Sequence, residues 1–264
     1  MKFNLKSLVV AAAFVAAGGA NAADLTLNVG DSITDQGYTV SELTGSGTLA
    51  FSSALLGALE LGGVTFEEVA PATLTVDGYS SVTAAAPIQS VTGNFDGTTL
   101  NITQVGTLGG ATQVLGEDAI IAEVSLNGGF ISVKDLRVDL TTQSVFGTLV
   151  GGNGVGTVTN LKIWDITTIE GPTSFTAQTG VITSNNTLSG LMITEEAFNL
   201  FVQAGDLTDL GAGALAGVND EGGYGTISST ITVTVTAVPE PSTYALMGVG
   251  LVGLGLMARR RVAK

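Results

Sequence analysis

The sequence predicts a mainly β fold, in the form of a single β-sandwich-like domain that carries two short helices. The first observation is a strict alternation of apolar and polar residues, rich in Thr, Val and Ile. Such alternation is typical of strands with one buried and one solvent-facing side. The second is that glycine or Asn/Asp breaks interrupt these runs, as turns between short strands do. No Pro- or Ser-rich linker divides the region, so one domain is expected.

Individual strands can be placed from this alternation. Five segments show it most clearly: 72–76, 98–103, 144–150, 158–166 and 227–238. The stretch 119–140 contains two further strands around Asn127-Gly128-Gly129, a tripeptide suited to the positive φ angles of a hairpin turn. Trp164, the only tryptophan, lies on one of the expected strands.

Two segments depart from the alternation and predict the helices. Thr194 can cap one helix, which Gly205 ends, and Ser52 or Ser53 can cap the other, which Gly62 ends. Each has apolar residues on one face: Phe198, Phe201 and Val202 in the first, Leu55, Leu56 and Leu59 in the second. Each helix also follows a short apolar strand. The similarity indicates either a weak internal duplication or two similar crossovers in one β fold.

The N-terminus has the three regions of a secretory signal peptide. Lys2 and Lys6 precede an apolar run over 8–17, and Ala20 and Ala22 form the small-x-small pattern that signal peptidase recognises. Cleavage after Ala22 would leave an exported chain that begins at position 23.

The exported region is strongly acidic. Between the two terminal segments it has three basic residues, Lys134, Arg137 and Lys162, and 22 acidic ones, so its formal net charge is −19. A region of this charge repels the phosphate backbone, which excludes nucleic acid as a partner, and it is expected to stay soluble outside the cell.

The chain has no cysteine and no histidine. Ser-His-Asp and Cys-His catalytic sites and zinc sites built on His or Cys are therefore excluded. The enzymes that remain would work through carboxylates, Lys, Tyr or hard cations. We expect no cofactor and no enzymatic activity.

Acidic pairs are the remaining candidates for chemistry. A glycosidase needs two carboxylates across a cleft, but nothing in the sequence brings any two acids together, and solvated surface charge explains them better. Asn219, Asp220 and Glu221 offer three oxygens in an expected glycine-flanked turn, the best candidate for calcium. No known calcium-loop pattern is present, so an ordinary turn is the alternative. The other acids considered are Glu67-Glu68, Glu117-Asp118, Glu195-Glu196, Asp206 and Asp209.

Two further groups of residues could form surfaces. Trp164, Tyr38, Tyr79 and Tyr224 could line a sugar-binding face, although core or rim positions explain scattered aromatic residues better. On a strand over 134–139, Asp135, Arg137 and Asp139 share one side. We expect this side to face solvent and to form cross-strand ion pairs.

The C-terminal tail contains Gly248, Gly250 and Gly253 in the spacing of a dinucleotide-binding loop. Such a loop needs a following strand and a ribose-binding acid about 20 residues later, for which the remaining chain is too short. The tail instead predicts a membrane helix. The 15 uncharged residues 244–258 span about 22 Å as a helix, less than the bilayer core of about 30 Å. The arginines after Ala258 would stay on the cytoplasmic side.

The order of parts in the tail closely resembles the PEP-CTERM sorting signal. These parts are Pro239-Glu240-Pro241, a short glycine-containing apolar helix, and Arg259-Arg260-Arg261 at the end of the chain. The resemblance covers only about the last 27 residues. It implies a Gram-negative bacterium, export through the Sec translocase, and a membrane-embedded exosortase that recognises the triplet and processes the tail. The arginines would act as the stop signal. Family members share this tail and not a fold.

Together these observations divide the chain into a signal peptide (1–22), an acidic β-rich exported domain (23–237) and a sorting segment with a short transmembrane helix (238–264). The expected partners are the Sec translocase, signal peptidase, the exosortase and an exopolysaccharide. The expected location is the cell surface or extracellular matrix, after an inner-membrane intermediate. We expect a structural or adhesive protein of a biofilm matrix. The alternative is a carbohydrate- or calcium-binding surface module.

Overall fold

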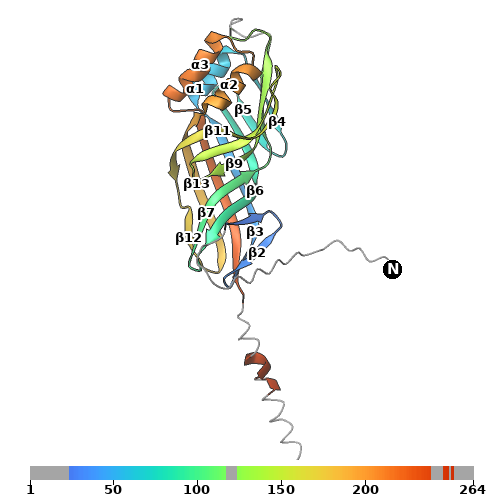
Figure 1. Cartoon of the computed structure of the whole chain (residues 1–264), viewed down its shortest axis with the longest axis vertical. Helices are drawn as coiled ribbons and strands as arrows, with labels where there is room; N and C mark the ends of the chain where they lie inside the picture. The colour runs from blue at the N-terminus through green and yellow to red at the C-terminus, as the bar shows by residue number, and fades with distance from the viewer. Residues whose placement is uncertain (1–23, 117–123, 239–245, 250, 253–264) are drawn as a thin grey trace, which may run out of the picture.

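The fold is that of a computed structural model, which describes residues 24–116, 124–238, 246–249, 251 and 252 (Figure 1). Within these residues a 14-stranded antiparallel sheet carries helices at one end. The strands are β1 (Leu25–Asn28), β2 (Ser32–Asp35), β3 (Tyr38–Phe51), β4 (Thr65–Val69), β5 (Thr73–Asp77), β6 (Ser81–Phe95), β7 (Thr99–Thr107), β8 (Gly110–Leu115), β9 (Gly129–Asp139), β10 (Ser144–Gly151), β11 (Gly156–Glu170), β12 (Ser174–Thr176), β13 (Gly180–Ile193) and β14 (Gly225–Ala237). The helices are α1 (Ser53–Leu61), α2 (Glu195–Ala204) and α3 (Asp209–Asp220). The prediction of a mainly β fold with few short helices is confirmed.

The strands join one continuous sheet in the order β12-β7-β6-β3-β14-β13-β11-β10-β9-β8-β4. Strands β1 and β5 also pair with β6, and β2 pairs with β3. A short pairing of β7 with β9, from Gln104↔Asp139 to Gly106↔Arg137, closes the sheet on itself. The predicted β-sandwich is not confirmed, because the described strands belong to one hydrogen-bonded sheet.

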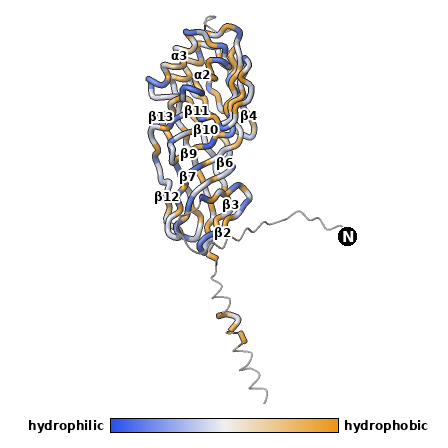
Figure 2. Tube along the Cα trace, in the orientation of Figure 1, coloured by the Kyte–Doolittle hydropathy of each residue, from blue (hydrophilic) through white to orange (hydrophobic). Residues whose placement is uncertain are grey.

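The interior has two apolar clusters, one at each end of the sheet. The helix end is the half covered by α1, α2 and α3, and its core includes Leu149, Ile163, Trp164 and Leu191. The tail end is the opposite half. Its smaller cluster consists of Leu27, Leu43, Ile88, Val105, Ile231, Val233 and Val235. Figure 2 shows the alternation of apolar and polar residues along the strands that supplies both clusters.

Hydrogen bonds between loops define the tail end. The Val238 N–H donates to the Gly37 carbonyl, the Gln36 side chain donates to the Phe95 carbonyl, and the Ala177 N–H donates to the Thr98 carbonyl. The turns after β2 and β6 therefore lie beside the end of β14, where the chain continues into its C-terminal tail.

Both predicted helices are confirmed with their caps. The Ser52 hydroxyl accepts a hydrogen bond from the Leu55 N–H, and the Thr194 hydroxyl accepts one from the Ala197 N–H. Helices α1 and α2 follow β3 and β13, which both pair with β14; an internal repeat stays a prediction. Helix α3 was not expected, because glycine has a low helix propensity and three glycines lie within it: Gly211, Gly213 and Gly217.

The predicted hairpin at Asn127-Gly128-Gly129 is wrong. Residues 117–123 lie outside the described part of the chain, and Ser125 forms only an isolated bridge with Leu207. Strand β9 pairs instead with β8, β10 and, near its end, β7, and its register with β8 places Gly110 opposite Lys134. A Cβ at Gly110 would collide with the Val133 carbonyl, so this approach requires glycine. Periodicity predicts that a segment forms a strand but does not predict which strand it pairs with.

Candidate functional site

The most distinctive cavity lies at the tail end, between strands that face one another across the smaller cluster. Its volume is about 90 Å³. Strands β1, β2, β3, β6, β7, β12, β13 and β14 contribute to its wall, so the site is assembled from both halves of the chain. The lining residues are Leu25, Leu27, Ile33, Asp35, Tyr38, Val40, Val91, Gly93, Asn94, Phe95, Leu100, Ile102, Phe175, Ala177, Ile182, Ser184, Ile231, Val233 and Val235.

Alternation along each strand explains why this wall is apolar. Ile231, Val233 and Val235 are buried on the inner side of β14, while Thr232 and Thr234 between them are less deeply buried. On β13, Ile182 lines the cavity and its neighbour Val181 is 67% exposed on the outer side. The side-chain pattern of the strands therefore creates an apolar interior that the sequence already encodes.

Aromatic and polar side chains lie where this cavity approaches the turns. The rings of Tyr38 and Phe95 meet edge to face, with centroids 5.8 Å apart. The only charged side chain in the wall is that of Asp35.

Asp96 orders the turn after β6. Its carboxylate accepts hydrogen bonds from the Thr98 N–H at 2.8 Å, the Thr98 hydroxyl at 2.8 Å and the Thr99 N–H at 2.7 Å. These donors favour the charged form and lower the pKa of Asp96, the Thr99 backbone contributing most.

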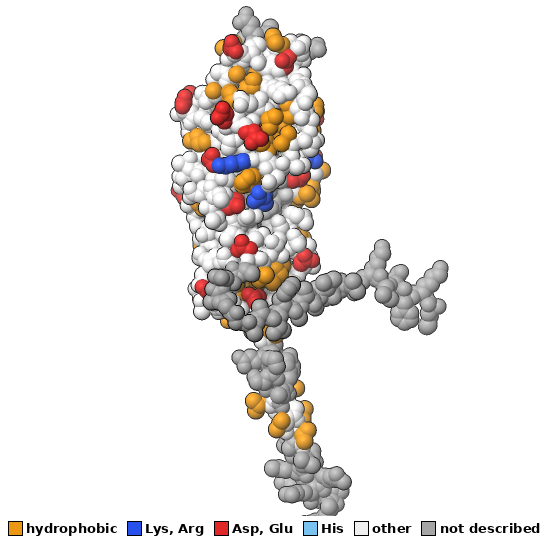
Figure 3. Space-filling model, in the orientation of Figure 1, with side chains coloured by type: hydrophobic (Ala, Val, Ile, Leu, Met, Phe, Trp, Pro, Cys, Tyr) orange, Lys and Arg blue, Asp and Glu red, His pale blue; other side chains and the backbone are white. Residues whose placement is uncertain are grey.

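The basic residues of the domain lie away from this cavity. Lys134, Arg137 and Lys162 form ion pairs with Asp135, Asp139 and Asp165, respectively. Figure 3 shows the Lys and Arg side chains of the visible face around the middle of the molecule, between its two ends. The lining of the tail-end cavity therefore contains one acidic side chain, that of Asp35, and no basic one.

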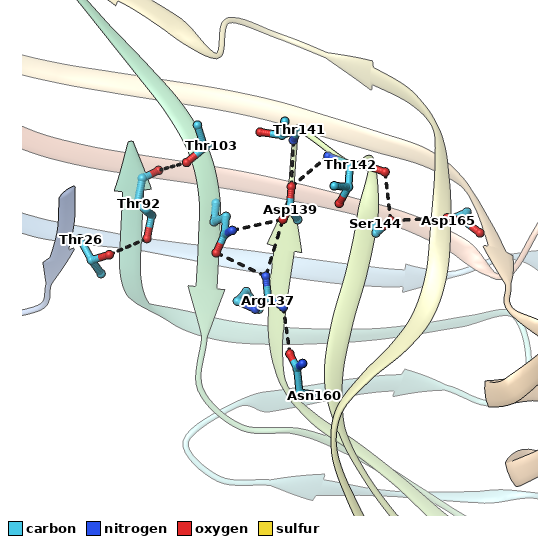
Figure 4. Close-up of polar contacts among 11 residues, drawn as sticks. Thr26, Thr92, Thr103, Arg137, Asp139, Thr141, Thr142, Ser144, Asn160 and Asp165 are labelled. Carbon is cyan, nitrogen blue, oxygen red and sulfur yellow. Dashed lines mark hydrogen bonds and ion pairs between the residues drawn. The ribbon is translucent and has the colours of Figure 1, made fainter. Parts of the chain in front are cut away.

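The charged segment 134–139 differs from its expected arrangement. Arg137 and Asp139 do share one side of β9, but they pair with each other, at 3.8 Å, and the predicted cross-strand ion pairs are wrong. Arg137 instead donates hydrogen bonds across strands to Gln104 and Asn160 (Figure 4). Its guanidinium carbon lies 4.3 Å from the centroid of the Phe146 ring. This network joins β7, β9, β10 and β11 beside the closure of the sheet, which indicates a structural role.

The four aromatic residues take core or rim positions, as favoured from the sequence, and do not form the alternative sugar-binding face. Trp164 and Tyr224 are only 4% and 2% exposed and belong to the helix-end core. The Tyr224 hydroxyl donates to the Leu215 carbonyl, and burial raises the pKa of Tyr224. Tyr79 donates to the Val64 carbonyl, and Tyr38 lines the tail-end cavity. A second cavity of about 60 Å³ lies beside the unpartnered indole N–H of Trp164.

A polar groove of about 390 Å³ crosses β3, β14, β13 and the end of β11. Hydroxyl and amide side chains dominate it, and Glu170 is its only charged side chain. Asn186, which is 7% exposed, has an Oδ1 atom without a hydrogen-bond partner. The groove residues are Ser46, Thr48, Glu170, Gly171, Asn185, Asn186, Thr187, Ser228, Ser229 and Thr230. Sequence analysis missed this groove, because it depends on which strands pair.

The calcium candidates lie at the end of α3 and not in a loop. Asn219 and Asp220 are helical, and Glu221 is the C-cap. The Asn219 amide is already engaged: its oxygen accepts from the Ile193 N–H at 3.0 Å, and its nitrogen donates to the Ile193 carbonyl at 3.4 Å. Among the described residues, no group of three or more acidic side chains could hold a metal ion. The expectation of a loop here is wrong.

The predicted sorting and processing residues lie outside the described part of the chain. These are Ala20, Ala22, Pro239, Glu240, Pro241, Arg259, Arg260 and Arg261. Of the predicted membrane helix, residues 246–249, 251 and 252 are described, and they are helical and exposed. None of the helices in the described ranges is long and apolar enough to cross a membrane.

Comparisons with known proteins give a clear result for the tail alone. Residues 237–261 match the PEP-CTERM protein-sorting motif, so the chain carries this motif directly after β14. No curated protein matches the chain. The domain is distantly similar to the solved structure of the heme-binding protein HtaB from Corynebacterium glutamicum, with 12% identity and a TM-score of 0.43. That match covers 75% of this chain and 98% of the other, and at this level it carries no argument about function.

The two hydrogen bonds of Asn219 predict a structural role for this residue. We expect Asn219→Ala to lower the free energy of unfolding by about 1–3 kcal/mol, since it leaves the polar backbone groups of Ile193 unpaired. Asp220→Ala, a neighbouring exposed control, should change it by less than about 0.5 kcal/mol. Urea unfolding measures both. A calcium-dependent rise in stability that Asp220→Ala abolishes would contradict this role.

The lowered pKa of Asp96 predicts a pH-dependent contribution to stability. A depressed carboxyl pKa stabilises the fold above the ordinary aspartate value of about 3.9, and this contribution is lost as the pH falls through the folded-state pKa. The stability difference between wild type and Asp96→Ala should therefore be present at neutral pH and shrink in acid. Urea midpoints at several pH values test this, with Asp77→Ala as an exposed control. A difference that grows on acidification would count against the prediction.

Proposed function

We propose that this protein is an exported structural or adhesive component of the cell surface or extracellular matrix, delivered there by exosortase processing of its tail. The observation that carries the proposal is the position of the PEP-CTERM motif, whose first residue is the last residue of β14. The motif implies an exosortase substrate, and the matrix role is our inference from the domain that precedes it.

The arrangement of β14 supports processing without loss of the fold. This strand lies between β3 and β13, and its buried residues contribute to both apolar clusters. Among the described residues after Ala237, Val238 contributes one backbone hydrogen bond to the domain, from its N–H to the Gly37 carbonyl. Cleavage within the tail would therefore leave both cores intact, as a released or displayed protein requires.

Composition and burial support a structural role over an enzymatic one. The chain lacks cysteine and histidine, and the three basic residues of the domain are already in ion pairs. The carboxylates of the described residues do not form a cluster of three or more that could hold a metal ion. We infer that the domain acts through its surface and its stability, without turnover.

The sorting proposal predicts a shortened C-terminus. Mass spectrometry of the extracellular protein should find that it ends before Arg259, because an exosortase would have removed the basic segment. Changing Pro239 and Pro241 to Ala should keep the protein in the membrane fraction by removing the recognition triplet, whereas Ser242→Ala serves as a neighbouring control. Extracellular protein that still ends at Lys264 would refute processing.

We propose a second candidate function, binding of an uncharged polysaccharide in the polar groove. Exposed hydroxyl and amide groups of Ser46, Ser228, Thr230 and Asn185 can exchange hydrogen bonds with sugar hydroxyls. In this candidate function, hydrogen bonds and not aromatic stacking hold the sugar. The groove would then provide the contact of a matrix component with an exopolysaccharide.

The groove can be tested with dextran in affinity electrophoresis. The double variant Thr48→Ala/Ser228→Ala should weaken retardation about ten-fold, the effect expected from losing one or two hydrogen bonds. Thr183→Ala/Thr232→Ala is the matched control, since this hydrogen-bonded pair lies on β13 and β14 and is not part of the groove. Equal loss in both variants, or no retardation of wild type, would exclude the groove as a dextran site.

A further inference from the structure

The tail-end cavity has a lining that suits an apolar guest and not water. Its wall contains sixteen apolar or aromatic side chains or glycine against three polar ones, Asp35, Asn94 and Ser184. Of these, the Ser184 hydroxyl already donates to the Pro172 carbonyl, and the Asn94 amide donates to Asp24. A water molecule needs two to four polar partners, which most of this wall does not offer.

The cavity is also large enough to hold part of a ligand. Pockets that enclose a whole drug-sized ligand measure about 300–1,000 Å³, so a cavity of about 90 Å³ has room for only a short stretch of a longer apolar chain. In composition, an apolar lining with a few polar groups, the cavity resembles a small-molecule binding site.

The helix end differs from the tail end in its cover: the cavity of about 60 Å³ there is enclosed in part by the helical residues Leu55, Phe201 and Leu215. At the helix end Val145, Leu149, Ile163 and Leu191 are fully buried. At the tail end many inward-facing apolar side chains remain partly exposed: Leu25, Ile33, Val40, Val91, Leu100, Ile102, Phe175 and Ile182. No described helix covers this end of the sheet (Figure 1).

The position of the tail indicates where such a ligand would come from. The cavity wall includes Val235, and β14 ends two residues later at Ala237, the first residue of the sorting motif. Only six residues, 238–243, separate the strand from the uncharged segment 244–258. Six extended residues span at most about 20 Å, so an anchored tail keeps the tail end within about that distance of the membrane.

The acidic side chains near the cavity favour some membrane lipids over others. Asp35 lies in the cavity wall, and Asp24, which accepts a hydrogen bond from Asn94, lies beside it. The three basic residues of the domain are paired elsewhere on the sheet. An anionic headgroup would meet only like charge here, whereas a headgroup that carries an ammonium can pair with Asp35.

We propose that the tail-end cavity binds the part of an acyl chain nearest the headgroup of a zwitterionic membrane phospholipid, so that the ammonium group can reach Asp35, while the tail holds the domain at the bilayer. The affinity of the cavity for an acyl chain follows from its lining, and only the membrane as its source rests on the proposed function. Binding of this kind would hold the domain against the bilayer with its tail end downward, and cleavage of the tail would end the proximity that favours it.

Photo-crosslinking tests the proposal on the membrane-bound protein, purified from cells that lack the sorting enzyme and reconstituted in phosphatidylethanolamine vesicles. A phosphatidylethanolamine probe with a diazirine in its acyl chain should label peptides that carry the cavity wall, such as those with Phe175 and Ile182. It should also label the tail segment 244–258, which serves as an internal reference. A phosphatidylglycerol probe should label the wall less, relative to the tail.

Two variants of adjacent residues on β13 separate the cavity from the outer surface. Ile182→Phe fills the cavity and should reduce wall labelling about ten-fold relative to the tail, the equivalent of excluding about two methylene groups. Val181→Phe places the same ring on the exposed side of the strand and should leave labelling unchanged. Thermal unfolding checks that both variants are folded.

The outcomes distinguish the two proposals. Tail labelling without wall labelling, or equal wall labelling in Ile182→Phe and wild type, would overturn the cavity proposal. Absence of tail labelling would count against the membrane intermediate instead. In that case the uncharged fluorescent probe N-phenyl-1-naphthylamine, added to the soluble protein, tests whether the cavity binds an apolar ligand. Its fluorescence should rise with wild type and with Val181→Phe, and it should not rise with Ile182→Phe. Equal labelling by the two headgroups would refute the choice of a zwitterionic lipid.

Discussion

The central pairing of β14 with β3 and β13 is the interaction on which the rest of the structure depends. Its register with β3 runs from Gly225↔Phe51 to Ala237↔Tyr38, and its register with β13 runs from Thr226↔Ser189 to Val235↔Gly180. Because the strand extends along the molecule, Ile227 packs in the helix-end core and Ile231, Val233 and Val235 pack in the tail-end cluster. One strand therefore joins both cores and also carries the chain to its sorting motif.

The two ends of β14 have different surroundings: helices cover the core at one end, and the cavity lies at the other. At one end α1, α2 and α3 cover the core, with Tyr224 bonded to the Leu215 carbonyl at the start of β14. At the other end only turns close the interior, which leaves the apolar wall around Phe175 and Ile182 partly exposed. The sorting motif begins at the less covered end. The sorting motif and the cavity thus belong to the same side of the molecule.

Local patterns predicted several of the elements. Alternation located β5, β7, β10, β11 and β14, since period-two burial is a property of each strand by itself. Hydroxyl residues before apolar faces located α1 and α2 with the caps at Ser52 and Thr194. Helix α3 was not predicted because packing against the rest of the fold stabilises it. Gly211 lets the helix approach the Val124 backbone so closely that a Cβ would collide with the Val124 carbonyl. Intrinsic propensity disfavours such a glycine, and packing overrides it.

The sequence by itself determined the exported, acidic and β-rich character of the protein and the identity of its tail. The sorting signal is a contiguous motif, read by another protein in a short stretch of chain, so its residues need no fold to be recognised. Tertiary structure decided that β9 pairs with β8, that Trp164 and Tyr224 lie in the core, and that Asn219 holds the Ile193 backbone. It also decided where the tail-end cavity and the polar groove lie. The cavity and the groove bring together strands far apart in the chain, and a burial pattern shows that a residue faces inward but not which residues it faces.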